Sequence, residues 1–123
     1  MLPQLQQEFD GHLNQAISDA QQLHSTLELE FKHLKESDLE AFQALQVRKQ
    51  HDVQTIQLFD ALRTQFCQNT NLDPDDQDFS RHLASEQQAK WLQLLVLLEA
   101  CDTLHRTSDM FMRTKLDSIS KAL

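Results

Sequence analysis

The near lack of turn-forming residues is what most constrains the fold of this chain, since its 123 residues include one Gly and two Pro. A protein of many short strands needs a turn every few residues, and Gly and Pro are the residues that most often mark those turns. The apolar residues recur at steps of three and four, which is the spacing of one face of an α-helix. We therefore predict an all-α fold, an elongated antiparallel helical hairpin or bundle of three long helices.

Local start and stop signals predict the helix boundaries. Ser37-Asp38-Leu39-Glu40 is typical of a capping box, in which an N-cap Ser precedes a Glu by three residues, so we expect a helix to start there. Residues 70–84 contain several Asx residues and an Asp-Pro step, which predicts a linker with a short helical turn or loop that folds over the bundle. One domain is expected over residues 1–123. Its helices are predicted at about residues 3–35, 38–69 and 85–122.

Composition and charge narrow the classes of function. The net charge of −8 at pH 7 disfavours nucleic acid and anionic membranes, because both attract basic proteins. The longest apolar run, residues 94–98, is far shorter than the roughly 20 residues of a membrane-spanning helix, and the first residues do not resemble a secretory signal. Two cysteines, Cys67 and Cys101, are too few for a disulfide framework. We expect a cytoplasmic protein with no membrane insertion.

The sequence offers little on which to build an active site. It has no glycine-rich phosphate loop, no nucleophile elbow and no HExxH motif. Glu30-x-x-His33 and Asp102-x-x-His105 partly match the Glu-x-x-His pairs of di-metal bundles, but the second pair lacks the Glu. We therefore predict no enzyme activity, metal or cofactor, and expect Glu30 and His33 to lie on a solvated helix edge. Lys49 interrupts the apolar seam of the second helix, and we expect it either to extend its ammonium group to the solvent or to pair with an acid.

The distribution of apolar residues around the third helix changes along its length. Residues 91–98 are apolar nearly all round, which predicts burial on more than one side. Two faces continue after them, a mixed seam with Cys101, His105 and Ser108 and an apolar face with Leu104 and Phe111, and two other helices cannot cover both. We expect part of this surface to bind a partner, or else to be covered by a second copy or by residues 70–84. The predicted partner-binding residues are Leu104, Phe111, Met112, Leu116, Ile119 and Leu123.

Several of these residues together resemble a known family. In the first two helices, residues stand at steps of four, four, four, seven and fourteen: Glu30, Leu34, Asp38, Phe42, Lys49 and Arg63. Trp91 and a leucine-rich stretch follow in the third helix. This spacing is similar to that of the FlgN-type flagellar export chaperones, over roughly residues 23–123. The family then has an Asn-x-x-Asn-Gly element, and here its positions are taken by His105, Ser108 and Asp109.

The resemblance implies a cytoplasmic chaperone of flagellar assembly. Such proteins bind the C-terminal amphipathic helix of hook–filament junction proteins, which are hook-associated, and deliver them to the type III export gate or ATPase complex. The residues at the family's positions are Glu30, Asp38, Lys49, Arg63, Trp91, His105, Ser108 and Asp109. The alternatives are a FliT-type or other type III secretion chaperone, a dimeric coiled-coil scaffold and a bundle metalloprotein. The sequence leaves the client protein and the oligomeric state open.

Overall fold

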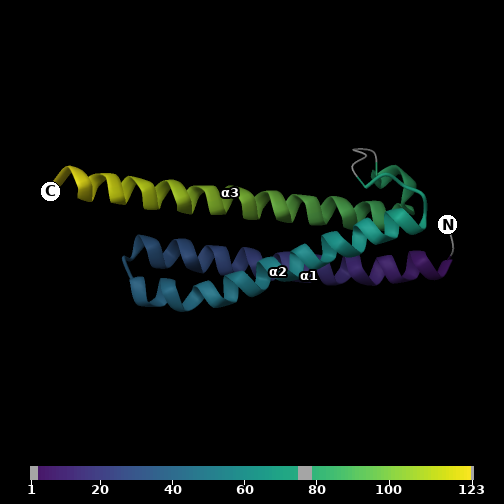
Figure 1. Ribbon diagram of the computed structural model, residues 1–123, viewed down its shortest axis with the longest axis horizontal. Helices are drawn as coiled ribbons and strands as arrows, with labels where there is room; N and C mark the ends of the chain where they lie inside the picture. The colour runs from purple at the N-terminus through teal and green to yellow at the C-terminus, as the bar shows by residue number, and fades with distance from the viewer. Residues whose placement is uncertain (1–2, 75–78, 123) are drawn as a thin grey trace.

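The computed structural model describes residues 3–74 and 79–122, and these residues form helices with no strand among them. α1 spans Pro3–Lys35, α2 spans Leu39–Asn69 and α3 spans Ser85–Ala122, and one turn of 3-10 helix, η1, spans Phe79–His82. The prediction of an all-α fold with three long helices is confirmed (Figure 1). No helix in these two described stretches is both long enough and apolar enough to cross a membrane.

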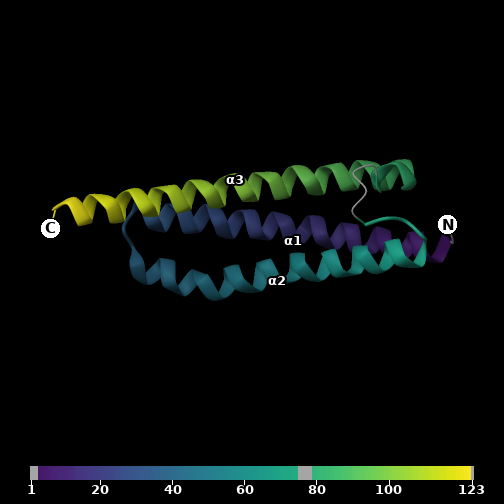
Figure 2. The same ribbon diagram turned by 45° about the horizontal axis from the view of Figure 1, so that its top comes forward.

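α1 lies between the other two long helices (Figure 2). α1 and α2 run in opposite directions as a hairpin, and α3 runs parallel to α1 (Figure 1). Side chains of α3 hydrogen-bond to backbone carbonyls of α1 that lie 81 residues earlier in the chain: Gln87 to Gln6, Cys101 to Ala20 and Lys115 to Leu34. Because this separation is constant, the two helices stay in register along their whole length, as in a parallel coiled coil.

The turn between α1 and α2 is tight because one residue in the left-handed conformation ends α1. Ser37 has φ 56°, and its N–H donates to the carbonyl of Leu34 while that of Asp38 donates to His33, the pattern of a Schellman motif. Asp38 then caps α2, since its carboxylate accepts the N–H of Ala41 at 3.1 Å. The prediction that Ser37 is the N-cap is wrong by one residue, because Ser37 already ends α1.

The largest core cluster lies where all three helices meet, near the start of α1. Phe9 stacks on Phe66 with ring centroids 4.2 Å apart, and its ring lies 6.2 Å from that of Phe59. Leu94 of α3 is fully buried in this cluster. Leu83, which directly follows η1, is buried in it too, so this residue packs on the bundle.

The outer face of α3 is more exposed than the sequence predicted. Leu92, Leu95 and Val96 are 62%, 44% and 59% exposed, although Leu94 between them is buried. The expectation that residues 91–98 are buried on more than one side is therefore wrong. The reason is that α1 covers one face of α3, while α2 approaches α3 at one edge, where Phe59 meets Trp91. An apolar surface is left open along the first half of α3.

α3 is longer than the hairpin on which it lies. Lys115 donates to the carbonyl of Leu34 at 3.4 Å and to the hydroxyl of Ser37 at 2.5 Å, so it marks the level of the turn between α1 and α2. Residues 116–122 continue past that level for about 10 Å of helix (Figures 1 and 2). The ion pair between Lys121 and Asp117 in this segment lies within α3 itself.

Candidate functional site

A buried polar layer crosses the bundle near the turn between α1 and α2. Lys49 of α2 donates to both carboxylate oxygens of Glu30 on α1, at 3.1 and 2.9 Å, and Gln46 donates to the same carboxylate at 2.9 Å. Glu30 is 2% exposed, so the expectation that it lies on a solvated edge is wrong; His33 on the same predicted edge is half-buried. The carboxylate tolerates burial because three hydrogen bonds and a positive charge replace its water. Lys49 pairs with an acid, which is one of the two predicted outcomes.

A second buried polar pair lies one helical turn away. Thr26 is four residues before Glu30 on α1, and Asp52 is three residues after Lys49 on α2. Both are buried, and the Thr26 hydroxyl donates to the Asp52 carboxylate at 2.5 Å. This pair was not predicted from the sequence. The available signal was the position of Asp52, which stands four residues before the seam residue Ile56 and so faces α1.

α3 joins the polar layer through His105. Its Nδ1 lies 3.4 Å from the Nζ of Lys49, within reach of a hydrogen bond donated by the ammonium group. Three positions of the family pattern, Glu30, Lys49 and His105, one from each helix, are therefore joined through the ammonium group of Lys49. The His105 ring is exposed, so the contact is a polar crosslink at the edge where α2 faces α3.

The other positions of that pattern lie at different levels. Asp38 caps α2. Arg63 lies over the ring of Trp91, with 5.8 Å between the guanidinium carbon and the ring centroid. Ser108 is buried, and its hydroxyl has no hydrogen-bond partner among the described residues. Asp109 is exposed and forms an ion pair at 3.1 Å with the Arg one turn later. These residues are thus distributed along the bundle and do not form one compact site.

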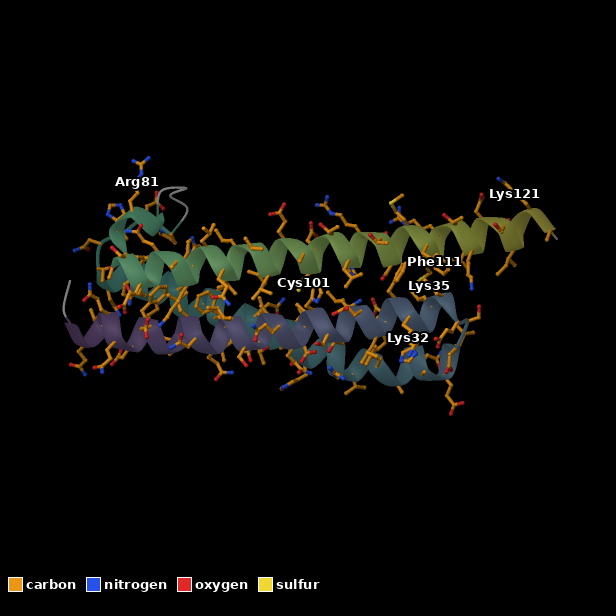
Figure 3. The ribbon with its side chains drawn as sticks, turned by 180° about the vertical axis from the view of Figure 1, so that it is seen from behind. Lys32, Lys35, Arg81, Cys101, Phe111 and Lys121 are labelled. Carbon is orange, nitrogen blue, oxygen red and sulfur yellow. The ribbon has the colours of Figure 1, made fainter. Side chains whose placement is uncertain are left out.

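Part of the predicted partner-binding surface of α3 packs on α1. Leu104 packs against a small core cluster between these two helices. Phe111 meets Phe31 edge to face, with ring centroids 5.7 Å apart, and lies on the side of α3 that faces α1 (Figure 3). Met112 is half-buried. These side chains hold the second half of α3 on the hairpin.

The rest of the predicted surface lies at or beyond the hairpin turn. Leu116 and Ile119 are 61% and 57% exposed, and Met110 on the outer face is also exposed. Leu123 lies outside the described residues. An exposed apolar surface therefore occupies the part of α3 that runs past the hairpin (Figure 2).

The described residues hold no group of three or more His, Cys, Asp or Glu side chains placed to bind a metal ion. Cys67 and Cys101 are both buried, and burial raises the pKa of each thiol above its ordinary value of 9.0. A protonated and inaccessible thiol is a poor nucleophile. The features that the described residues offer for function are therefore packing surfaces and polar contacts between helices.

Comparison with known proteins supports the resemblance noted in the sequence. The family model described as FlgN protein matches residues 1–123, so the match extends over all three helices and the segments that connect them. No curated protein and no solved structure matches.

Proposed function

Because the chain belongs to the FlgN family of flagellar export chaperones, we propose that it binds hook–filament junction proteins through their C-terminal amphipathic helix and delivers them to the flagellar type III export apparatus. The observation that carries this proposal is the exposed apolar end of α3. A client helix has an apolar stripe that stays unburied until assembly, and packing on another helix covers it. The client is thereby kept from aggregating. The binding takes place in the cytoplasm, and the export gate or its ATPase complex receives the client.

Leu116 and Ile119 form the centre of the proposed contact. They are three residues apart, so they share one face of α3. Full burial of a Leu or Ile side chain contributes roughly 1.5–3 kcal/mol, so burying the 61% and 57% that Leu116 and Ile119 still expose contributes roughly 1–2 kcal/mol apiece. Met112 precedes Ile119 by seven residues and Leu123 follows Leu116 by seven, so the sequence extends the surface in both directions.

Calorimetric titration of the purified chain with a purified hook–filament junction protein tests the proposal. Ile119→Asp is expected to weaken binding by about tenfold or more, because it places a charge in an apolar contact. Val47→Asp is the matched control, since Val47 is 77% exposed on α2 and lies away from the proposed surface. It should leave the affinity unchanged. If the Ile119 variant and the unmodified chain bind the client with equal affinity, the client does not bind at this end of α3. If the unmodified chain does not bind the client, the proposed function is refuted.

A dimeric coiled-coil scaffold is the second candidate function. Leu92 and Val96 favour it, because they form an exposed apolar row outside the proposed client surface. Sedimentation distinguishes the two candidates. A stable dimer that binds no junction protein supports the scaffold, whereas a chain that binds the client one to one supports the chaperone.

A further inference from the structure

The side of α3 that points away from the hairpin carries a second heptad pattern. Leu94 and Cys101 are buried where α3 packs on α1. Val96 and Thr103 follow them by two residues, which turn about 200° around a helix, so they lie on the opposite side. Alternating steps of four and three run through these two residues and define the outer seam: Ala89, Gln93, Val96, Ala100, Thr103, Thr107, Met110 and Thr114. Every Asp, Glu, Lys and Arg of α3 lies off this seam.

The described residues leave the outer seam open. α3 lies at the edge of the molecule with the hairpin on one side of it (Figure 2). Val96 and Met110 are large apolar side chains of the seam, and both are mostly exposed. From Val96 to Thr107 the seam lines a hollow of about 550 Å³, whose other wall is His24 and Glu28 of α1. An uncharged strip with a concave middle is the shape on which another helix packs.

The threonines of the outer seam tolerate burial. The hydroxyls of Thr107 and Thr114 each donate at 2.9 Å to a backbone carbonyl one turn earlier on α3, those of Thr103 and Met110. Burial against another helix therefore leaves neither hydroxyl without a hydrogen-bond partner. Their methyl groups stay available for packing.

The charges of α3 change sign along the helix. The first half, residues 85–102, has three acids and one base, a net charge of −2. The second half, residues 103–122, has four bases and two acids, a net charge of +2. Two copies of α3 that pair antiparallel bring each acidic half against a basic half, whereas parallel pairing opposes like charges. This charge gradient favours a second copy of the chain as the partner of the seam.

One antiparallel register fills every layer of such a pair with seam residues. The two residues of a layer have numbers that add up to 203: Ala89 with Thr114, Gln93 with Met110, Val96 with Thr107 and Ala100 with Thr103. The same register brings Glu99 of one copy within about 3 Å, along the helix, of the level of Arg106 of the other. Glu99 forms no ion pair within the described residues. Arg106 pairs with Asp102 in an exposed contact, so its guanidinium is also open to a second carboxylate.

We propose that two copies of this chain pair antiparallel through their outer seams, about a two-fold axis that passes between Ala100 and Thr103. The net charge of −8 on each copy opposes association in general, and the small side chains of the seam bury little area. We therefore expect a dimer with a dissociation constant of roughly 1–100 μM.

Pairing of this kind does not depend on the proposed function and leaves the client surface open. Leu116 and Ile119 follow Leu98 and Cys101 by 18 residues, which make five full turns of helix. They therefore lie on the hairpin side of α3, away from the outer seam. A dimer with this interface keeps one client surface on each copy.

Disulfide crosslinking of single-Cys variants tests the register. A tagged Val96→Cys chain mixed with a Thr107→Cys chain should form a linked dimer, because the two positions share a layer. Val96→Cys alone should not crosslink, since the two copies of residue 96 lie about 16 Å apart along the helices, beyond the reach of a disulfide. Crosslinking of Val96→Cys with itself would indicate parallel pairing and overturn the proposal. The unmodified chain is the control, because Cys67 and Cys101 are buried.

Charge reversal in sedimentation tests the contact between Glu99 and Arg106. Glu99→Arg should weaken the dimer about tenfold, because it places two cations together. Glu36→Arg is the matched control, since Glu36 is exposed at the turn between α1 and α2 and its reversal changes the net charge equally. It should not weaken the dimer. Addition of Arg106→Glu to the Glu99→Arg chain should restore most of the affinity. Equal effects of the two reversals, or no recovery in the double variant, would overturn the proposal.

Sedimentation of the unmodified chain separates this proposal from the proposed function. A monomer at every concentration up to several hundred micromolar would overturn the pairing, whether or not the chain binds a junction protein. A dimer with the expected crosslinks that binds no junction protein would support the pairing and refute the proposed function. Circular dichroism checks that each variant keeps its helix content, and the exposure of the substituted positions favours this.

Discussion

Replacement of Lys49 by Met tests the energetic role of the buried polar layer. The Glu30 side chain is 3% exposed, and Lys49 supplies two of its three hydrogen bonds together with its counter-charge. Removal of one partner from a buried ion pair typically destabilises a protein by about 3–5 kcal/mol, because the other charge is left uncompensated. Lys49 itself is 20% exposed, which lets water approach the site. We therefore expect a loss at the lower end of that range, about 3 kcal/mol in the free energy of unfolding.

Urea unfolding followed by circular dichroism measures this loss. The set of variants is Lys49→Met, Glu30→Gln and the two combined. The double variant should recover about half of the loss or more, because a neutral amide at position 30 is less costly to bury than a carboxylate. Lys90→Met is the control, since Lys90 pairs with Asp10 at 2.7 Å but both side chains are about a third exposed, so its loss should stay within about 1 kcal/mol. If Lys49→Met costs no more than this control, or if the double variant is as unstable as the single one, the reasoning is refuted.

Four further predictions concern stability. Gly11→Ala should raise the free energy of unfolding by about 1 kcal/mol in urea, because Gly11 is helical and exposed and an added Cβ meets open space; a decrease would contradict this. Ser37→Gly should raise the thermal midpoint by a few degrees, since a left-handed residue costs a non-Gly side chain about 1 kcal/mol, while the hydrogen bond lost from Lys115 is exposed and Lys115 still donates to the carbonyl of Leu34; an unchanged midpoint would count against it. Ser108→Ala should be neutral or stabilising by up to about 1–3 kcal/mol, because its buried hydroxyl has no partner within the described chain; a clear loss of stability would reveal a partner. Burial raises the pKa of the Cys67 and Cys101 thiols above 9.0, so above that pH the unfolded chain releases protons that the folded chain keeps. The free energy of unfolding should therefore be fully retained below pH 9.0 and fall above it, and a Cys67→Ala/Cys101→Ala chain should show a smaller fall.

The helices were predictable because their signals are local. Apolar steps of three and four in a chain with so few turn residues leave little choice other than long helices. The signal for the break between α1 and α2 was also local, but its detail was not: the capping-box pattern predicted Ser37 as the N-cap of α2, and the structure has Asp38 there. The hydrogen bonds of the turn decide between them, because Ser37 is used to end α1.

The burial of individual residues on α3 and α1 was harder to predict. Leu92 and Leu94 are the same residue two positions apart in one apolar run, yet the first is exposed and the second is fully buried. Glu30 was predicted to be solvated and is buried, because Lys49 and Gln46 of α2 compensate its charge. The type of side chain sets the free-energy cost of its burial. Whether hydrogen bonds or an opposite charge compensate this cost depends on the residues of the neighbouring helix.

The amino-acid sequence was enough to predict that this chain forms three long helices, where each begins and ends to within a residue or two, and which family pattern it carries. These properties depend on hydrogen bonds and side-chain spacings within one helix or one turn. The tertiary structure alone decided that α3 lies parallel to α1, that Lys49 joins Glu30 and His105, and that the outer seam of α3 is left uncovered. Such properties depend on how far apart two helices pack and which faces they turn to each other, and no periodicity within a single helix contains that information.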